Sequence, residues 1–100
     1  MICLGGVGVI SVASNIVPGP LGRMVAAARA GDVDGARSIH ESLASLFETL
    51  FIEPNPIPVK TAAHALGLID DAEVRLPLTP ATEETTARLS QALGALRVSV

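Results

Sequence analysis

The side chains that could perform covalent, acid–base or metal chemistry are few, and they lie far apart in the sequence. Lys60 is the only lysine, and an amine that forms a Schiff base must be activated by desolvation or by a neighbouring cation. Lys60 instead begins a predicted helix in a polar, proline-rich setting. Asp70 and Asp71 could act on a proton or a metal ion, but they are adjacent in a predicted exposed turn without a converging partner. Because Cys3 is the only cysteine and His40 has no second ligand at a suitable spacing, we predict no metal site and no catalytic residue.

The glycine-rich stretch Gly6 to Ser11 does not match a dinucleotide-binding motif. It lacks the third glycine, and it lies before and within a predicted strand instead of following one. We therefore predict no nucleotide and no other cofactor. The loop Ser11 to Gly19 follows this strand, and in a barrel such a loop would lie on the face that carries active sites. Ser14 and Asn15 could be polar groups of a pocket, or they could satisfy the loop backbone and cap the next helix, which is the interpretation we favour.

The run Val7-Gly8-Val9-Ile10-Ser11-Val12 predicts a β-strand. A nearly continuous apolar run, without alternation, is typical of a strand that is buried on both faces in a parallel sheet. A parallel strand needs partners, and the sequence offers no second strand of this quality. The pattern therefore indicates that the rest of a sheet is missing.

The segment Phe51-Ile52-Glu53-Pro54-Asn55-Pro56-Ile57-Pro58-Val59-Lys60 has the most restricted backbone in the chain. Its three alternate prolines fix φ three times and remove three backbone donors. The residues before the prolines, Glu53, Asn55 and Ile57, are pushed towards extended geometry. We predict a stiff joint that sets the direction between two helices.

Four helices are predicted from apolar residues at a spacing of three and four. The first runs from Pro20 or Leu21 to Ala30, and Gly31 suits the position after its end. Asp32 caps the second helix, which carries the strongest periodic pattern. The third runs from about Pro58 to Leu66. The apolar stripe of the second helix comprises Val33, Ala36, Ile39, Leu43, Leu46, Phe47, Leu50 and Phe51.

The fourth helix follows the turn Leu76-Pro77-Leu78-Thr79-Pro80. Thr79 is the predicted N-cap, with Pro80 as the first helical residue. Glu83 and Glu84 then lie in the first turn and Arg97 in the last, as the helix dipole favours. The predicted fold class is therefore mainly α.

Composition limits the possible partners. Of 100 residues, 49% are apolar but only 17% are charged, against about 25% in an average chain, which favours helices packed on a larger body. The net charge of −3 offers no basic surface for nucleic acid. The apolar N-terminus lacks the positive region of a signal peptide and is shorter than the ~20 residues of a membrane span. We expect a cytoplasmic protein without a membrane or nucleic-acid partner.

Several separated motifs, in the same order, resemble the C-terminal part of the dihydrodipicolinate synthase family. Residues 4–15, LGGVGVISVASN, look like the eighth barrel strand of that family and the loop after it. Residues 51–60 look like its EPNPIPVK segment, and residues 66–68 and 75–80 resemble its next two motifs. The resemblance implies a pyruvate-dependent lyase on a (β/α)8 barrel. Such an enzyme condenses pyruvate with aspartate semialdehyde through a lysine Schiff base in lysine (diaminopimelate) biosynthesis, as a homotetramer.

The same resemblance implies that this chain lacks the catalytic groups. The Schiff-base lysine of the family lies on the sixth strand, so Lys60 does not correspond to it, and the chain has no tyrosine to shuttle protons. One pocket position carries over: Ile10, whose main chain would face the pyruvate-binding site. Residues 1–31 would be the last β/α unit of an incomplete barrel and residues 32–100 the helical C-terminal domain.

Three functions remain open on the sequence. The chain could be a fragment of the lyase that is inactive alone. It could be a free-standing helical module that oligomerises through its apolar faces. It could also be one part of a split barrel that is active only with a partner chain.

Overall fold

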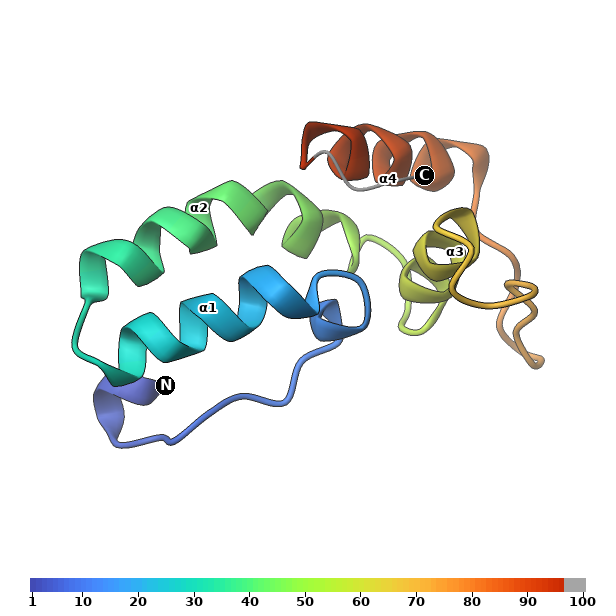
Figure 1. Ribbon diagram of the computed structural model, residues 1–100. Coiled ribbons are helices and arrows are strands. Elements are labelled where there is room, and N and C mark those ends of the chain that lie inside the picture. Colours follow the sequence, from blue (N-terminus) through green and yellow to red (C-terminus); the bar gives the residue numbers. More distant parts are fainter. Residues whose placement is uncertain (97–100) are drawn as a thin grey trace. The chain divides into compact units, whose positions relative to one another are not determined.

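The computed structural model describes residues 1–96 and is built from helices and connecting segments (Figure 1). The predicted mainly α-helical fold with four long helices is confirmed. The chain divides into two compact units, residues 1–44 and residues from 45 onward, and α2 runs from the first into the second. The domain boundary between residues 31 and 32 stays a prediction. The elements are η1 Ile2–Leu4, η2 Ala13–Asn15, α1 Pro18–Arg29, α2 Val33–Thr49, α3 Ile57–Ala65 and α4 Glu83–Ala95.

The strand predicted at Val7 to Val12 is absent from residues 1–96, and this prediction is corrected. Gly6 to Ser11 lacks regular secondary structure and forms a drawn-out connecting segment (Figure 1), here called the extended segment, and Val12 is a bend. A strand exists only through hydrogen bonds to a neighbouring strand, and the described residues provide none. The described residues contain no second strand that could pair with this apolar segment.

Helix α1 begins earlier than predicted, at Pro18. Proline suits this position because its fixed φ is helical and its missing N–H would have no partner in the first turn. The predicted stop at Gly31 is confirmed: Gly31 has φ of +83°. The N–H of Asp32 donates to the carbonyl of Ala27 at 2.9 Å, which closes a Schellman motif.

The predicted cap of α2 is also confirmed, since Asp32 Oδ1 accepts a hydrogen bond from the N–H of Gly35 at 2.9 Å. The apolar stripe is only partly buried. Leu43 and Leu46 are fully enclosed, whereas Val33 is 48% exposed. Helix α2 ends at Thr49, earlier than predicted, so Leu50, which is buried, and Phe51, which is 59% exposed, lie beyond it. The buried face of α2 is therefore narrower than the sequence pattern.

In the second unit, α3 and α4 pack against each other. The residues that α3 buries are Ile57, Pro58, Val59, Ala62 and Ala63. Helix α4 contributes Leu89 and Leu93 to the core. Helix α3 ends as α1 does: Gly67 has φ of +75°, and the N–H of Leu68 donates to the carbonyl of Ala63 at 2.9 Å.

The predicted start of α4 is wrong by three residues. Thr82, and not Thr79, is the N-cap: its Oγ1 accepts a hydrogen bond from the N–H of Thr85 at 3.2 Å. The N–H of Thr82 itself donates to Glu53 Oε2 at 3.1 Å. Glu53, which lies 29 residues earlier in the sequence, therefore contacts Thr82, the threonine that caps α4. Glu83 and Glu84 lie in the first turn as predicted, and Arg97 lies outside the described residues.

Candidate functional site

Ile10, the one position predicted to face a substrate, lies near the end of the extended segment. Its side chain is completely exposed. The segment is held at its far end by η2, where Ala13, Ile16 and Val17 are buried. Ile10 therefore precedes the buried residues at η2, and its contact with a substrate stays a prediction.

Ser14 and Asn15 serve the loop backbone in this structure. Ser14 Oγ donates to the carbonyl of Ser11 at 2.6 Å, and Asn15 Nδ2 donates to the carbonyl of Val12 at 3.0 Å. Both bonds close a turn over three residues, as expected when Ser and Asn satisfy a local turn. The loop part of the role that we favoured for these two residues is therefore confirmed, whereas the predicted capping is wrong, because the N-cap of α1 is Val17 and no side chain caps it.

The backbone of the extended segment is open on both edges. Within residues 1–96, no backbone hydrogen bond engages an N–H or carbonyl group of Val7, Gly8, Val9 or Ile10. The side chains are open as well, since Val7 is 80% exposed and Val9 43%. Exposed apolar side chains are unfavourable in water. Backbone N–H and carbonyl groups without hydrogen bonds are unfavourable in a protein core. The arrangement suits pairing with other strands.

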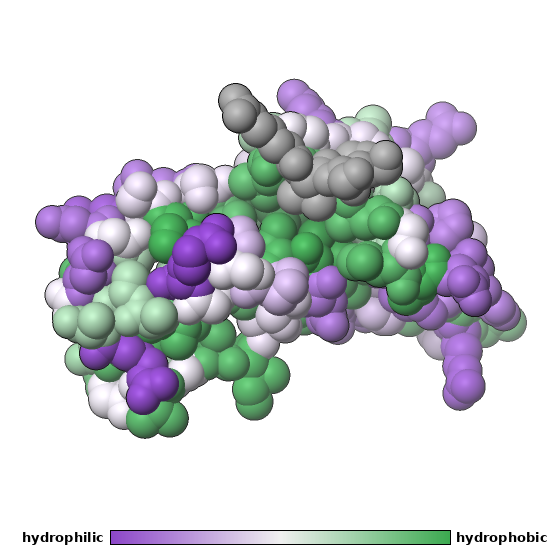
Figure 2. All heavy atoms as spheres, in the orientation of Figure 1, coloured by the Kyte–Doolittle hydropathy of each residue, from purple (hydrophilic) through white to green (hydrophobic). Residues whose placement is uncertain are grey.

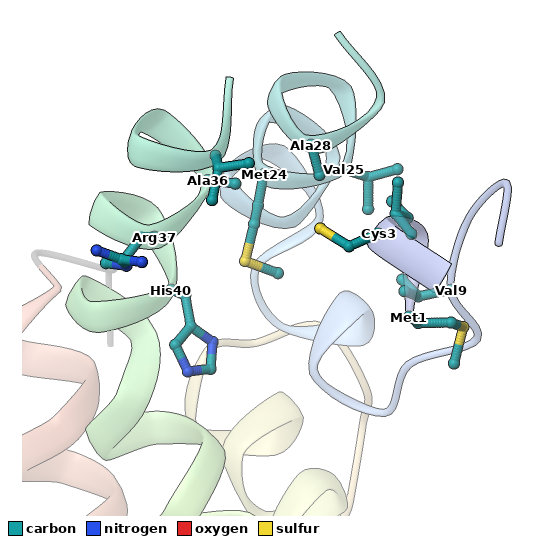
Figure 3. Close-up of a pocket in the computed structure, with 11 residues that line it drawn as sticks. Met1, Cys3, Val9, Met24, Val25, Ala28, Ala36, Arg37 and His40 are labelled. Atoms are coloured by element: carbon teal, nitrogen blue, oxygen red, sulfur yellow. The ribbon is translucent and has the colours of Figure 1, made fainter. Parts of the chain in front are cut away.

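An apolar hollow of about 370 Å³ lies beside this segment, within the first unit (Figure 3). Val9 and the N-terminal residues line one side of it, and α1 lines the other with Met24, Val25 and Ala28. Arg37 and His40 from α2 are its polar lining residues. A hollow of this composition can receive hydrocarbon side chains. On the face of the molecule that Figure 2 shows, hydrophobic and hydrophilic residues both reach the surface.

Lys60 lies in a polar hollow of about 270 Å³ in the second unit. Its Nζ donates a hydrogen bond to the main-chain oxygen of Glu73, and the hollow is also lined by Asp71 and Arg75. Asp71 Oδ1 in turn accepts a hydrogen bond from the N–H of Glu73 at 2.9 Å. Lys60 thus tethers a connector, and its surroundings are charged and partly open. They do not form the dry pocket that a Schiff-base amine requires.

The remaining candidates for metal or acid–base chemistry are not brought together. Asp70 and Asp71 are both exposed, and Cys3 is an exposed thiol. Among residues 1–96 no group of three or more His, Cys, Asp or Glu side chains could hold a metal ion. Within the same range no helix is long and apolar enough to cross a membrane.

Two contacts at the proline joint escaped the sequence reasoning. The Glu53 carboxylate reaches the start of α4, and the Lys60 ammonium reaches the connector at Glu73. Their separations of 29 and 13 residues leave no periodic signal in the sequence. The one sequence feature that could have suggested these two contacts is that charged residues lie on both sides of the prolines.

These features define a class: a mainly helical chain in which one apolar connecting segment has no strand partner among residues 1–96. Comparison with known proteins gives the family. The model of the dihydrodipicolinate synthetase family matches residues 1–96, and the chain belongs to this family.

The chain spans about a third of the length of its relatives. It is 50% identical over 97 residues to 4-hydroxy-tetrahydrodipicolinate synthase of Shewanella piezotolerans, and the alignment covers 97% of this chain and 33% of that enzyme. It is also 50% identical over 98 residues to the enzyme of the same name from Methanosarcina barkeri, again covering 33% of the relative. The match therefore accounts for one part of a longer enzyme.

Solved structures agree with this assignment. Dihydrodipicolinate synthase from Thermotoga maritima superposes with a TM-score of 0.93 at 41% identity, over 97% of this chain and 32% of that one. The enzyme from Acinetobacter baumannii, solved in complex with pyruvate, gives a TM-score of 0.89 at 43% identity, over 95% of this chain and 32% of that one. At these identities the likeness extends beyond the general fold to the family.

Proposed function

We propose that this chain provides the C-terminal third of a 4-hydroxy-tetrahydrodipicolinate synthase. The whole enzyme condenses pyruvate with aspartate semialdehyde through a lysine Schiff base, as a step of lysine (diaminopimelate) biosynthesis. It acts in the cytoplasm as a homotetramer. The observation that carries the proposal is the open segment Val7 to Ile10 in a chain that spans about a third of its relatives' length.

In this function the chain supplies position and shape, and the catalytic groups come from the other two thirds. The extended segment completes the sheet, and the main chain of Ile10 faces the pyruvate site. Helices α3 and α4 form the appended domain. The Glu53 carboxylate holds the start of α4, and the Lys60 ammonium holds the connector at Glu73. The chain alone is inactive, because it has no tyrosine and its single lysine is bound to a carbonyl in a polar hollow.

A chimera tests the function. The residues of the Shewanella piezotolerans enzyme that precede the matched third are joined in one polypeptide to this chain, and condensation of pyruvate with aspartate semialdehyde is assayed. We expect activity within tenfold of the intact Shewanella enzyme. The same chimera with Ile10→Pro, which deletes the main-chain N–H, should lose most of it, whereas Ile10→Val should not. An inactive, folded chimera would refute the proposal.

A further inference from the structure

We propose that the polar hollow around Lys60 is a binding site for a free α-amino acid. The hollow has a volume of about 270 Å³ and is lined by Lys60, Asp71, Glu73, Val74 and Arg75. All five residues belong to the second unit. The proposed function gives this hollow no part in the reaction. Four features of the hollow support an amino acid as its ligand.

The first feature is that the hollow contains both signs of charge in equal number. Lys60 and Arg75 provide two cations, and Asp71 and Glu73 provide two carboxylates. A simple anion in the hollow would be attracted by the cations and repelled by the carboxylates, and a simple cation would meet the reverse. A zwitterion meets an opposite charge at each of its ends. The charges therefore favour a ligand with one ammonium and one carboxylate group.

The second feature is that two of the four charged side chains are engaged by the protein and two are open. Lys60 Nζ donates to the main-chain oxygen of Glu73, and Asp71 Oδ1 accepts from the N–H of Glu73. Within residues 1–96, no hydrogen bond or ion pair engages the side chain of Glu73 or of Arg75. A guanidinium binds a carboxylate through two parallel N–H donors. The carboxylate of the ligand would therefore lie on Arg75, and its ammonium on Glu73.

The third feature is that the backbone carrying these two open groups is held in place. The main chain of Glu73 is bonded at its N–H by Asp71 and at its carbonyl by Lys60 of α3. Two residues later, the carbonyl of Arg75 accepts a hydrogen bond from the N–H of Leu78 at 3.0 Å. A site that is ordered before binding loses less entropy when the ligand arrives.

The fourth feature is the short distance over which the charges are presented. Asp71, Glu73 and Arg75 are exposed. Ala72 and Val74, which lie between them, are half-buried. This alternation is typical of an extended chain, in which residues two apart share a side and their Cα atoms are roughly 6–7 Å apart. Pockets for drug-sized ligands measure about 300–1,000 Å³, so this hollow suits a smaller molecule whose opposite charges are close together, as in an α-amino acid with a small side chain.

Isothermal titration calorimetry of the full 100-residue chain tests the inference, with L-alanine as the probe at millimolar concentrations and constant ionic strength. We expect one L-alanine to bind to each chain. Arg75→Gln and Glu73→Gln each remove one charge of the open pair, and each should weaken binding at least tenfold. Acetate and methylammonium each carry one of the two charges of alanine, and each should bind at least tenfold more weakly than L-alanine.

Arg88→Gln and Glu48→Gln are the matched controls. Each removes the same charge from an exposed side chain of the second unit that does not line the hollow. Both controls should bind L-alanine as the unchanged chain does. Thermal unfolding followed by circular dichroism should be alike for all four variants, since the side chains of Glu73 and Arg75 hold no other residue among residues 1–96.

The possible outcomes separate the alternatives. Absence of L-alanine binding overturns the inference. Acetate that binds as tightly as L-alanine would make the hollow an anion site, and methylammonium that does so would make it a cation site, and either result also overturns the inference. Control variants that lose as much affinity as Glu73→Gln would place the binding elsewhere, with the same consequence. The activity of the chimera is a separate measurement, so the proposed function stands or falls independently of these results.

Discussion

Glu53 and Thr82 are joined by a hydrogen bond across 29 residues: Glu53 Oε2 accepts from the N–H of Thr82 at 3.1 Å. Thr82 is the N-cap of α4, and its own Oγ1 accepts from the N–H of Thr85. One carboxylate at the proline joint thus holds the residue from which the last helix starts. A negative charge at this end is also favoured by the helix dipole.

Removing the Glu53 carboxylate should destabilise the second unit. We expect Glu53→Ala to lower the free energy of unfolding by about 1 kcal/mol, because the hydrogen bond and the charge at the start of α4 are both lost. Glu53→Gln should lose less, since the amide oxygen can still accept. Urea denaturation followed by circular dichroism measures this. Glu41→Ala, an exposed glutamate within α2, is the control and should change the stability by less than ~0.5 kcal/mol.

Two threonines distinguish the observed start of α4 from the predicted one. Thr82→Ala removes the capping oxygen and should cost about 1 kcal/mol. Thr79→Ala changes an exposed residue outside the helix and should be nearly neutral. Thermal unfolding of both variants decides the matter. The reverse order of stabilities would restore Thr79 as the cap.

Leucine truncations should separate the core from the surface of the second unit. Leu46 is fully buried, so Leu46→Ala should lower the free energy of unfolding by about 3 kcal/mol through lost burial and the remaining cavity. Leu68 is 58% exposed, and Leu68→Ala should cost less than ~0.5 kcal/mol. Chemical denaturation of the two variants provides the comparison. Equal losses would mean that the buried face of α2 was wrongly assigned.

Two glycines of the first unit should respond oppositely to the same substitution. Gly31 has φ of +83°, which a side chain rarely adopts, so Gly31→Ala should destabilise by about 1 kcal/mol. Gly22 lies within α1 with open space around its Cα, so Gly22→Ala should stabilise by about 0.5–1 kcal/mol. Melting temperatures of the two variants should shift in opposite directions. A stabilised Gly31→Ala variant would contradict the left-handed geometry of this stop.

The isolated chain should not trap pyruvate. A Schiff-base amine must lie in a dry pocket with a proton shuttle nearby, and Lys60 is instead bonded to the carbonyl of Glu73 in a polar hollow. Incubation with pyruvate and borohydride, followed by mass spectrometry, should return an unmodified mass. The Shewanella piezotolerans enzyme, treated in the same way, serves as the positive control. A stoichiometric adduct on Lys60 would make this chain a minimal aldolase.

Local features were predictable because their causes are local. The stops at Gly31 and Gly67 and the cap at Asp32 follow from backbone freedom and short-range hydrogen bonds, and the structure confirms all three. The four helices follow from apolar spacing in the same way. The start of α4 was not predictable, because both Thr79 and Thr82 suit a cap and the distant Glu53 bonds to only one of them.

The apolar character of Val7 to Ile10 could be read from the residues alone, whereas the strand predicted there needed partners that the described residues do not contain. The sequence also determined the family, through motifs kept in order. The burial of individual side chains in the predicted stripe, and the positions of the Glu53 carboxylate and the Lys60 ammonium, depend on the folded chain. The physical reason is that burial and long-range hydrogen bonds depend on neighbours that are distant in sequence. A strand depends on such neighbours entirely, and for Ile10 the described chain does not contain them.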